Sequence, residues 1–357
     1  MSKNLVSRVL CLVSCVLCLV SLTSNAQTPA YSIQTVPIRG AVYSSLLATA
    51  NNNVVIGSHK KRIYFFNEWG EKLQEFHTKM WVHATPSIVN DSLIALGSYD
   101  GRIYFFDERG VLKNSIKPGG RVFTSLAQID SSTVLFGTEQ RKIVFYNLRN
   151  DSLKFVKTKG LTHGSPVLLS NNFSCIGSND NYLYIFNDSN QLAARYKTEK
   201  WIMHSKALEL SDSSITFGSY DKNLYGIDLQ GNTLWKFRTK GKIHASPRKI
   251  DDEKIVVGSF DKHIYIVNNA GELLRSIPTK KRIVSSAVIT PDKKIIIGSY
   301  DKHLYILNEN GDIEQKIPIG GKIFSTPTLL SNGTIVCATT NGKAIFIRRR
   351  GDKETRY

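Results

Sequence analysis

The sequence predicts an all-β protein: an eight-bladed β-propeller of four-stranded blades, with the last blade closed by the N-terminal strand. Three observations predict this fold. A repeat of about forty residues occurs eight times, each repeat contains four short strand-like runs, and the two ends of the chain complement each other. Because the repeat is unbroken, we expect residues 27–357 to form a single domain.

A glycine followed by Ser or Thr marks each of the first seven repeats. Successive markers are 40 residues apart, except for one spacing of 41 between the fourth and the fifth. The markers are Gly57, Gly97, Gly137, Gly177, Gly218, Gly258 and Gly298, with Ala338 in the eighth repeat. A chance alignment would not keep its phase over eight copies, so the period indicates a repeat architecture.

Each repeat contains four runs of β-branched or alternating apolar residues, separated by turn residues. In the seventh repeat these runs cover 283–289, 294–299, 303–308 and 313–319. The first run begins with small residues, as expected where strands converge on an axis. The third usually has a Tyr seven places after the marker, which we expect to fill the widening space between blades.

Five of the hairpins that follow a marker contain an aspartate: Asp100, Asp180, Asp221, Asp261 and Asp301. A ring of catalytic acids is one interpretation. We favour a structural role, because Asp tolerates tight hairpin geometry and caps it locally.

The two ends of the chain predict how the ring closes. The eighth repeat ends after its third run, at 344–348, and lacks an outer strand. Residues 36–40 copy residues 317–321, which end the outer strand of the seventh repeat. We therefore expect the N-terminal strand to complete the last blade and to remove an exposed sheet edge.

The sixth repeat shows which family this pattern is similar to. A small-small-Pro strand at 245–247 leads to a Gly-Ser-x-Asp hairpin at 258–261, an aliphatic-Tyr strand at 264–266 and an Asx-x-x-Gly turn at 268–271. This pattern resembles the pyrroloquinoline-quinone-type propeller repeat over residues 31–351. The family includes quinone-dependent dehydrogenases and non-catalytic binders, notably the propeller lipoprotein of the outer-membrane β-barrel assembly machinery.

The chain departs from the dehydrogenases of that family. Their blade-locking motif has a Trp four residues after the turn glycine, and here only Gly231 has one, at Trp235. The sequence contains no adjacent cysteine pair and no carboxylate-rich segment for a calcium-quinone site. The resemblance therefore implies the binder branch, and we expect no cofactor.

Residues 1–26 predict a cleaved signal peptide and a periplasmic or secreted protein. Lys3 and Arg8 precede an apolar stretch at 9–22, and small residues at 24 and 26 fit signal-peptidase cleavage after Ala26. A lipoprotein anchored through Cys15 is the second interpretation. We expect Cys175 and Cys337, which remain in the mature chain, to be small core residues without a disulfide.

The chain has 47 Lys and Arg against 29 Asp and Glu. In a four-stranded meander, the connection into the first strand and the hairpin between the second and third strands lie on the same face. The whole basic surplus of the mature chain falls in those segments, so we expect one basic face that binds an anionic partner. The basic candidates for partner binding are Arg121, Lys240, Lys242, Lys280, Arg282 and Lys322.

Four histidines share one register, fourteen residues before the marker: His83, His163, His204 and His244. Aromatic and aliphatic residues occupy this register in the other repeats, which suggests packing between blades. Histidines on consecutive blades are also a possible metal or anion site. We assign them to partner binding near one mouth of the channel and predict no metal.

Together these features predict an exported, non-enzymatic and monomeric scaffold that uses its basic face to bind an envelope protein or an anionic polysaccharide. The alternative is an enzyme, a polysaccharide lyase or a metal-dependent hydrolase, with its site at the histidine-lined mouth. We do not expect nucleic acid binding, because of the compartment, or a membrane-spanning segment in the mature chain.

Overall fold

The computed structural model describes residues 31–210 and 213–350. The predicted signal peptide at 1–26, with Cys15, lies outside the described residues, as does the C-terminal segment 351–357. Among the residues described, no helix is long and apolar enough to cross a membrane.

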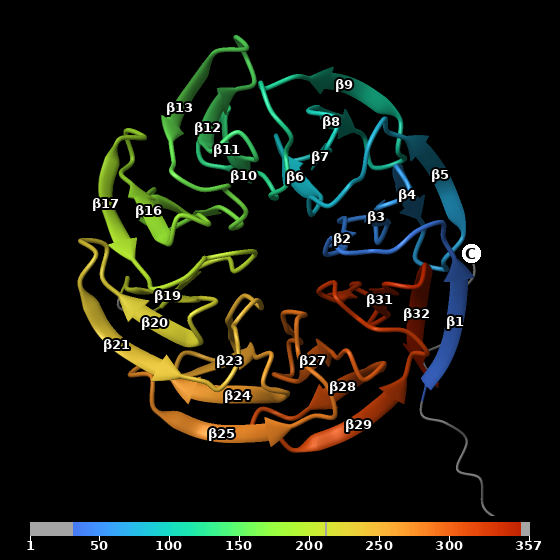
Figure 1. Ribbon diagram of the computed structural model, residues 1–357. Helices are drawn as coiled ribbons and strands as arrows, with labels where there is room; N and C mark the ends of the chain where they lie inside the picture. The colour runs from blue at the N-terminus through green and yellow to red at the C-terminus, as the bar shows by residue number, and fades with distance from the viewer. Residues whose placement is uncertain (1–30, 211–212, 351–357) are drawn as a thin grey trace, which may run out of the picture.

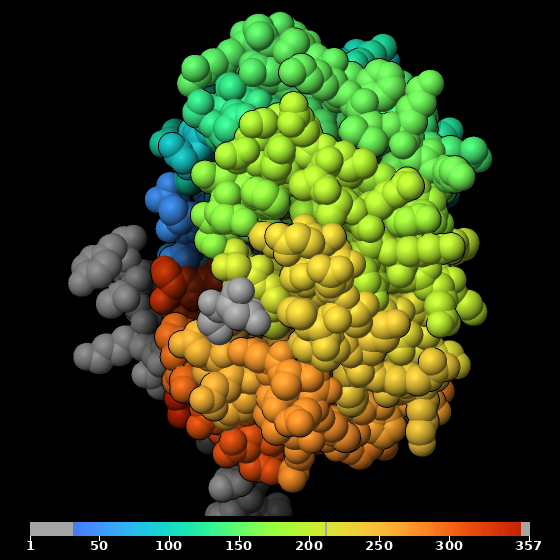
Figure 2. Space-filling view, turned by 90° about the vertical axis from the view of Figure 1, so that its left-hand side faces the viewer, coloured from blue at the N-terminus to red at the C-terminus, as the bar shows by residue number. Residues whose placement is uncertain are grey.

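Eight antiparallel sheets of four strands each surround a central axis, and the chain passes from one sheet to the next in order (Figure 1). Along the rim, the blades follow one another in chain order (Figure 2). The predicted eight-bladed propeller is confirmed.

Each blade contains four strands. In order from the axis to the rim we call them the inner, second, third and outer strands. The inner strands are β2 (Leu47–Ala48), β6 (Ser87–Val89), β10 (Ala127–Gln128), β14 (Val167–Leu168), β18 (Leu208–Glu209), β22 (Arg248–Lys249), β26 (Val288–Ile289) and β30 (Thr328–Leu329). The second strands are β3 (Val54–Ser58), β7 (Leu93–Gly97), β11 (Thr133–Thr138), β15 (Ser174–Gly177), β19 (Ile215–Gly218), β23 (Lys254–Gly258), β27 (Ile295–Gly298) and β31 (Ile335–Thr339).

The third strands are β4 (Arg62–Phe66), β8 (Ile103–Phe106), β12 (Lys142–Asn147), β16 (Tyr182–Phe186), β20 (Asn223–Ile227), β24 (His263–Asn268), β28 (His303–Leu307) and β32 (Lys343–Arg349). The outer strands are β5 (Lys72–His77), β9 (Leu112–Ile116), β13 (Leu153–Lys157), β17 (Leu192–Lys197), β21 (Thr233–Arg238), β25 (Leu273–Pro278), β29 (Ile313–Pro318) and β1 (Tyr31–Pro37).

The inner strands are shorter than the sequence predicts. The first run of the seventh repeat was expected to be a strand over 283–289, but only Val288 and Ile289 pair with β27. The residues before them bond sideways to the preceding blade instead: Ile283 N–H donates to Ser259 O at 3.0 Å, and Ser286 Oγ accepts from Ser246 N–H at 2.8 Å. Near the axis, contacts between blades therefore replace the ladder within the blade.

Strand β1 closes the ring. It pairs antiparallel with β32 in a register that places Thr35 opposite Ile345, and the two strands lie side by side in Figure 1. Strand β1 is thus the outer strand of the last blade, whose other three strands are β30, β31 and β32. The predicted closure is confirmed.

The marker glycines allow neighbouring blades to pack closely. A Cβ placed on Gly258 would overlap Ile283 of the next blade, and Gly218 has the same relation to Ile243. The eighth repeat has Ala338 at this position, in one apolar cluster with Val42. The glycines therefore mark where a β-branched side chain of the following blade packs against the second strand.

The second and third strands form the core of each blade. Their apolar residues are buried, and Cys175 and Cys337 are among them as free thiols, as expected. Burial raises the pKa of each thiol to about 12, so both are inert small core residues.

Candidate functional site

The connections between blades and the hairpins between second and third strands lie together on one face, which we call the hairpin face. Hydrogen bonds join them in several blades. Lys240 N–H, in a connection, donates to Asp261 Oδ2 in the next hairpin at 2.7 Å, and Tyr99 N–H donates to Trp81 O at 2.9 Å. The opposite face, with the turns between first and second strands, is called the turn face.

The six basic candidates all lie in connections on the hairpin face and are exposed: Arg121, Lys240, Lys242, Lys280, Arg282 and Lys322. Arg121 lies 3.5 Å from Glu139. Within the described part of the chain, the other five make no salt bridge with an acidic side chain. Their charges are therefore available to a partner.

Aromatic side chains accompany these cations, and the sequence analysis missed them. Lys242 Nζ lies 4.9 Å from the ring centroid of Tyr220, and Arg282 lies 5.0 Å from that of Phe260 and 4.4 Å from that of Tyr300. Such stacking holds a cation over a ring and restricts its orientation. The signal was present in the sequence, because these three aromatic residues all stand two places after a marker glycine.

Two tryptophans are also exposed on the hairpin face. Trp81 is 46% exposed and Trp201 49% exposed, although each contacts a neighbouring tyrosine. Trp81 stands two places, and Trp201 three places, before a histidine of the shared register. Half-exposed tryptophans and exposed cations on one face are typical of protein-binding surfaces.

The four histidines lie one layer deeper, inside the channel. They form, with the other residues of their register, a layer across the channel that we call the histidine layer: Tyr43, His83, Phe123, His163, His204, His244, Val284 and Phe324. The ring centroids of Phe123 and His163 are 4.0 Å apart, and those of His204 and His244 are 4.2 Å apart. The histidines therefore line the interior and are covered by the aromatic residues of the hairpin face.

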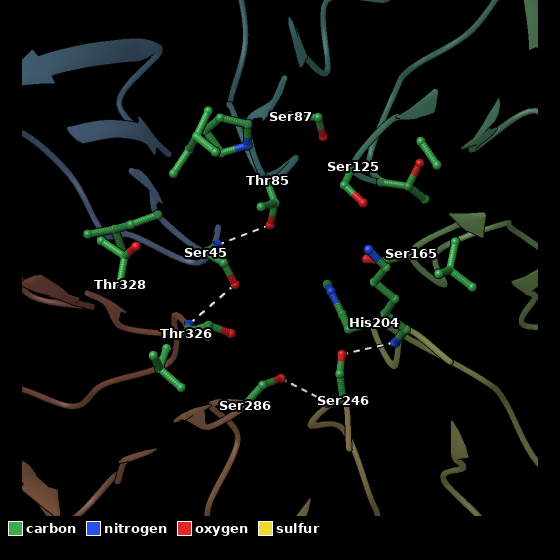
Figure 3. Close-up of a pocket in the computed structure, with 18 of the residues that line it drawn as sticks. Ser45, Thr85, Ser87, Ser125, Ser165, His204, Ser246, Ser286, Thr326 and Thr328 are labelled. Carbon is green, nitrogen blue, oxygen red and sulfur yellow. Dashed lines mark hydrogen bonds between the residues drawn. The ribbon is translucent and has the colours of Figure 1, made fainter. Parts of the chain in front are cut away.

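His204 has a special position in this layer. Its backbone adopts a left-handed conformation, with φ of 64°, at the single 41-residue spacing. Its ring contacts His83 and Phe123 as well as Phe324, from blades on other sides of the channel. Figure 3 shows His204 projecting toward the middle of the ring of side chains. The extra residue thus lets one imidazole cross the channel.

Burial keeps the histidine layer neutral. It lowers the pKa of His244 to about 4, and it lowers that of His163 to about 4 despite the opposing charge of Glu139, whose Oε1 lies 3.6 Å from His163 Nε2. The pKa values of His83 and His204 are also lowered, first by burial. Among the described residues, no group of three His, Cys, Asp or Glu side chains is placed to hold a metal ion.

Beyond the histidine layer, the channel widens into a cavity of about 830 Å³. Its walls are the inner strands and the residues just before them, so it opens toward the turn face. Figure 3 shows the hydroxyl side chains that surround it, including Ser45, Thr85 and Ser286. The histidine layer forms its floor.

These features define an eight-bladed β-propeller with one basic and aromatic face and a channel blocked by packed rings. It is similar to the crystal structure of BamB from Moraxella catarrhalis, with a TM-score of 0.74 and 14% identity, over 88% of this chain and 98% of that one.

Two other solved structures are also similar in fold. The computationally designed Ika8 protein has a TM-score of 0.71 at 14% identity, covering 87% of this chain and 98% of that one. The WD40 β-propeller domain of Doa1 has a TM-score of 0.58 at 19% identity, covering 76% and 93%. No protein-family model matches the sequence, and no curated protein matches it. At these identities the likeness establishes the fold.

Proposed function

We propose that this protein is an exported, non-enzymatic scaffold that binds an acidic surface of another cell-envelope protein through its hairpin face. One observation supports this most directly: unpaired cations and half-exposed aromatic rings lie together around the channel mouth. Arg, Trp and Tyr contribute most of the binding energy in protein interfaces. The hairpin face contains all three residue types, because it carries Arg282, Tyr300 and the two tryptophans Trp81 and Trp201.

The fold is consistent with this role. Propellers with this architecture serve as binding platforms, and the non-catalytic branch that the repeat pattern resembles has the same number of blades. Export is inferred from the predicted signal at 1–26. Protein binding is favoured over an anionic polysaccharide because half-exposed tryptophans are hot-spot residues of protein interfaces.

The enzymatic alternative receives less support from the geometry. The histidine rings pack face to face against aromatic neighbours, with centroids 4.0 to 4.2 Å apart in the closest pairs. A general base works best when its pKa lies near the operating pH. Burial lowers the pKa of all four imidazoles away from that range.

The test compares two variants of the mature protein in crosslinking from envelope extract, followed by affinity measurement with the captured partner. The first variant reverses four charges of the hairpin face: Lys240→Glu, Lys242→Glu, Lys280→Glu and Arg282→Glu. The matched control reverses four exposed charges elsewhere: Arg149→Glu, Lys154→Glu, Lys236→Glu and Lys293→Glu.

We expect the first variant to weaken binding by about tenfold or more and the control to change it little, because close charge pairs across interfaces couple strongly. The difference should shrink as salt rises, because screening acts over about 10 Å at 0.1 M. Equal binding by both variants would rule out the hairpin face. If only a polysaccharide is captured, the partner is a glycan and the proposal of a protein partner is wrong.

A further inference from the structure

We propose that the cavity on the turn-face side of the histidine layer binds a small anionic sugar, with several hydroxyls and a carboxylate or phosphate group. This site is separate from the hairpin face, because the histidine layer closes the channel between them. Its volume of about 830 Å³ lies within the usual range for small-ligand sites.

The cavity wall is rich in hydrogen-bond donors. The register two residues after the histidine layer contains Ser or Thr in seven blades: Ser45, Thr85, Ser125, Ser165, Ser246, Ser286 and Thr326. Four of these oxygens accept a backbone N–H from the preceding blade, as Thr85 does from Ser45 at 3.1 Å and Ser286 from Ser246 at 2.8 Å. Once its oxygen has accepted, a hydroxyl proton is available to donate.

The fifth blade replaces the hydroxyl with Lys206, and the neighbouring sixth blade adds Arg248 from its inner strand. Neither side chain has a salt bridge within the described ranges. Arg248 Nε donates to Ala287 O at 3.3 Å, which holds the guanidinium against the next blade. Burial and the nearby charge of Arg248 lower the pKa of Lys206, so two partly desolvated cations lie close together.

No Asp or Glu is among the residues that line the cavity. Two cations without a counter-charge are costly to bury, and a bound anion would offset that cost through charge-assisted hydrogen bonds. The floor contains the rings of Phe123 and Phe324, which offer an apolar surface. Donor hydroxyls, two cations and an aromatic floor together fit a sugar with an anionic group.

The first experiment uses the mature wild-type chain and three probes in isothermal titration calorimetry: glucuronate, glucose 6-phosphate and glucose. We expect at least one anionic sugar to bind saturably, with glucose about tenfold weaker or more, because a charge-assisted hydrogen bond contributes more than a neutral one. The preferred anion distinguishes carboxylate from phosphate. If neither anion binds, or if glucose binds as tightly as both, the proposal is wrong.

The second experiment locates the site. Lys206→Met and Arg248→Met should each weaken binding of the preferred anion by about tenfold. Lys154→Met, on the exposed outer strand β13, is the matched control and should bind as wild type does. Unchanged affinity in the two cavity variants would overturn the proposal. If a variant does not fold, the comparison of the three probes on wild type still decides.

The hairpin-face variant with four reversed charges separates this site from the proposed function. It should lose the protein partner and keep the anionic sugar at wild-type affinity. Loss of sugar binding in that folded variant would place the ligand on the hairpin face and would contradict a site beyond the histidine layer.

Discussion

The hydroxyl of Tyr225 donates to Asp221 Oδ2 at 2.7 Å, inside the fifth blade. The same oxygen accepts Glu199 N–H, at 3.0 Å, from the connection that enters the blade. One carboxylate therefore joins a third-strand tyrosine, its own hairpin and the incoming chain. The same hydroxyl-to-carboxylate bond occurs in four other blades, for example between Tyr265 and Asp261.

Tyr225→Phe should lower the free energy of unfolding by about 1 to 2 kcal/mol, because it removes a buried hydrogen bond to a charged group. Urea denaturation measures the change. The control is Tyr182→Phe, in a third strand whose Tyr182 ring faces Arg195 at 5.1 Å. Tyr182 makes no hydroxyl hydrogen bond within the described residues, so this variant should be nearly neutral. Equal losses in the two variants would show that the hydrogen bond to Asp221 makes no special contribution to stability.

The sequence predicted both partners of this bond but not the bond itself. Asp221 was interpreted as a turn former and Tyr225 as a filler between blades, and the structure confirms the turn, because Asp221 Oδ1 accepts Asn223 N–H at 3.0 Å. The meeting of hydroxyl and carboxylate depends on how the hairpin curls over the third strand. A repeat pattern gives the register of residues but not that curl.

At the candidate site, too, the sequence predicted the register of the residues but not their contacts in three dimensions. The shared register predicted that His83, His163 and His244 lie near the channel, and they do. It could not show that a left-handed residue turns His204 across the channel. Lys206 stands where the other repeats have Ser or Thr, and an alignment of the repeats shows this difference. Its exposure to a cavity depends on the three-dimensional ring.

Gly258→Ala should destabilise the protein by about 1 to 3 kcal/mol, the usual cost of overpacking a close contact. The added methyl would overlap Ile283 of the next blade. The reverse change Ala338→Gly, at the same register, should cost only about 0.5 to 1 kcal/mol, from backbone entropy. Thermal melting of both variants measures the difference.

A double variant tests whether the contact between blades is the cause. Gly258→Ala with Ile283→Ala should be more stable than the sum of the two single losses predicts, because each change relieves the other. Strict additivity would show that Gly258 is needed for a reason other than Ile283.

Removing residues 27–40 from the mature protein should lower the melting temperature and promote aggregation, because it strips β1 from β32 and exposes the edge of the last blade. Removing residues 353–357 should be nearly neutral, since no repeat position needs them. Light scattering and melting curves measure both effects. Equal damage from the two deletions would contradict a special role for the closing strand.

Acidification from pH 7 to pH 4 should destabilise the protein through the histidine layer. Burial lowers the pKa of His244 to about 4, and the charge of Arg282 adds to this effect. In the unfolded chain the pKa of this histidine is near 6.5. Between about pH 6.5 and 4 the unfolded state therefore binds more protons than the folded state, and stability falls as the pH is lowered. For one such histidine the loss is on the order of 3 kcal/mol.

His244→Phe isolates this effect, because Phe123 and Phe324 already occupy the same register in other blades. The variant should have a shallower decline of melting temperature between pH 7 and pH 4 than wild type, since one neutral buried imidazole no longer has to be protonated on unfolding. His77, exposed on the outer strand β5, gives the control: His77→Phe should leave the slope unchanged. If His244→Phe and wild type lose stability in parallel, protons are taken up elsewhere, and the histidine layer does not govern the acid response.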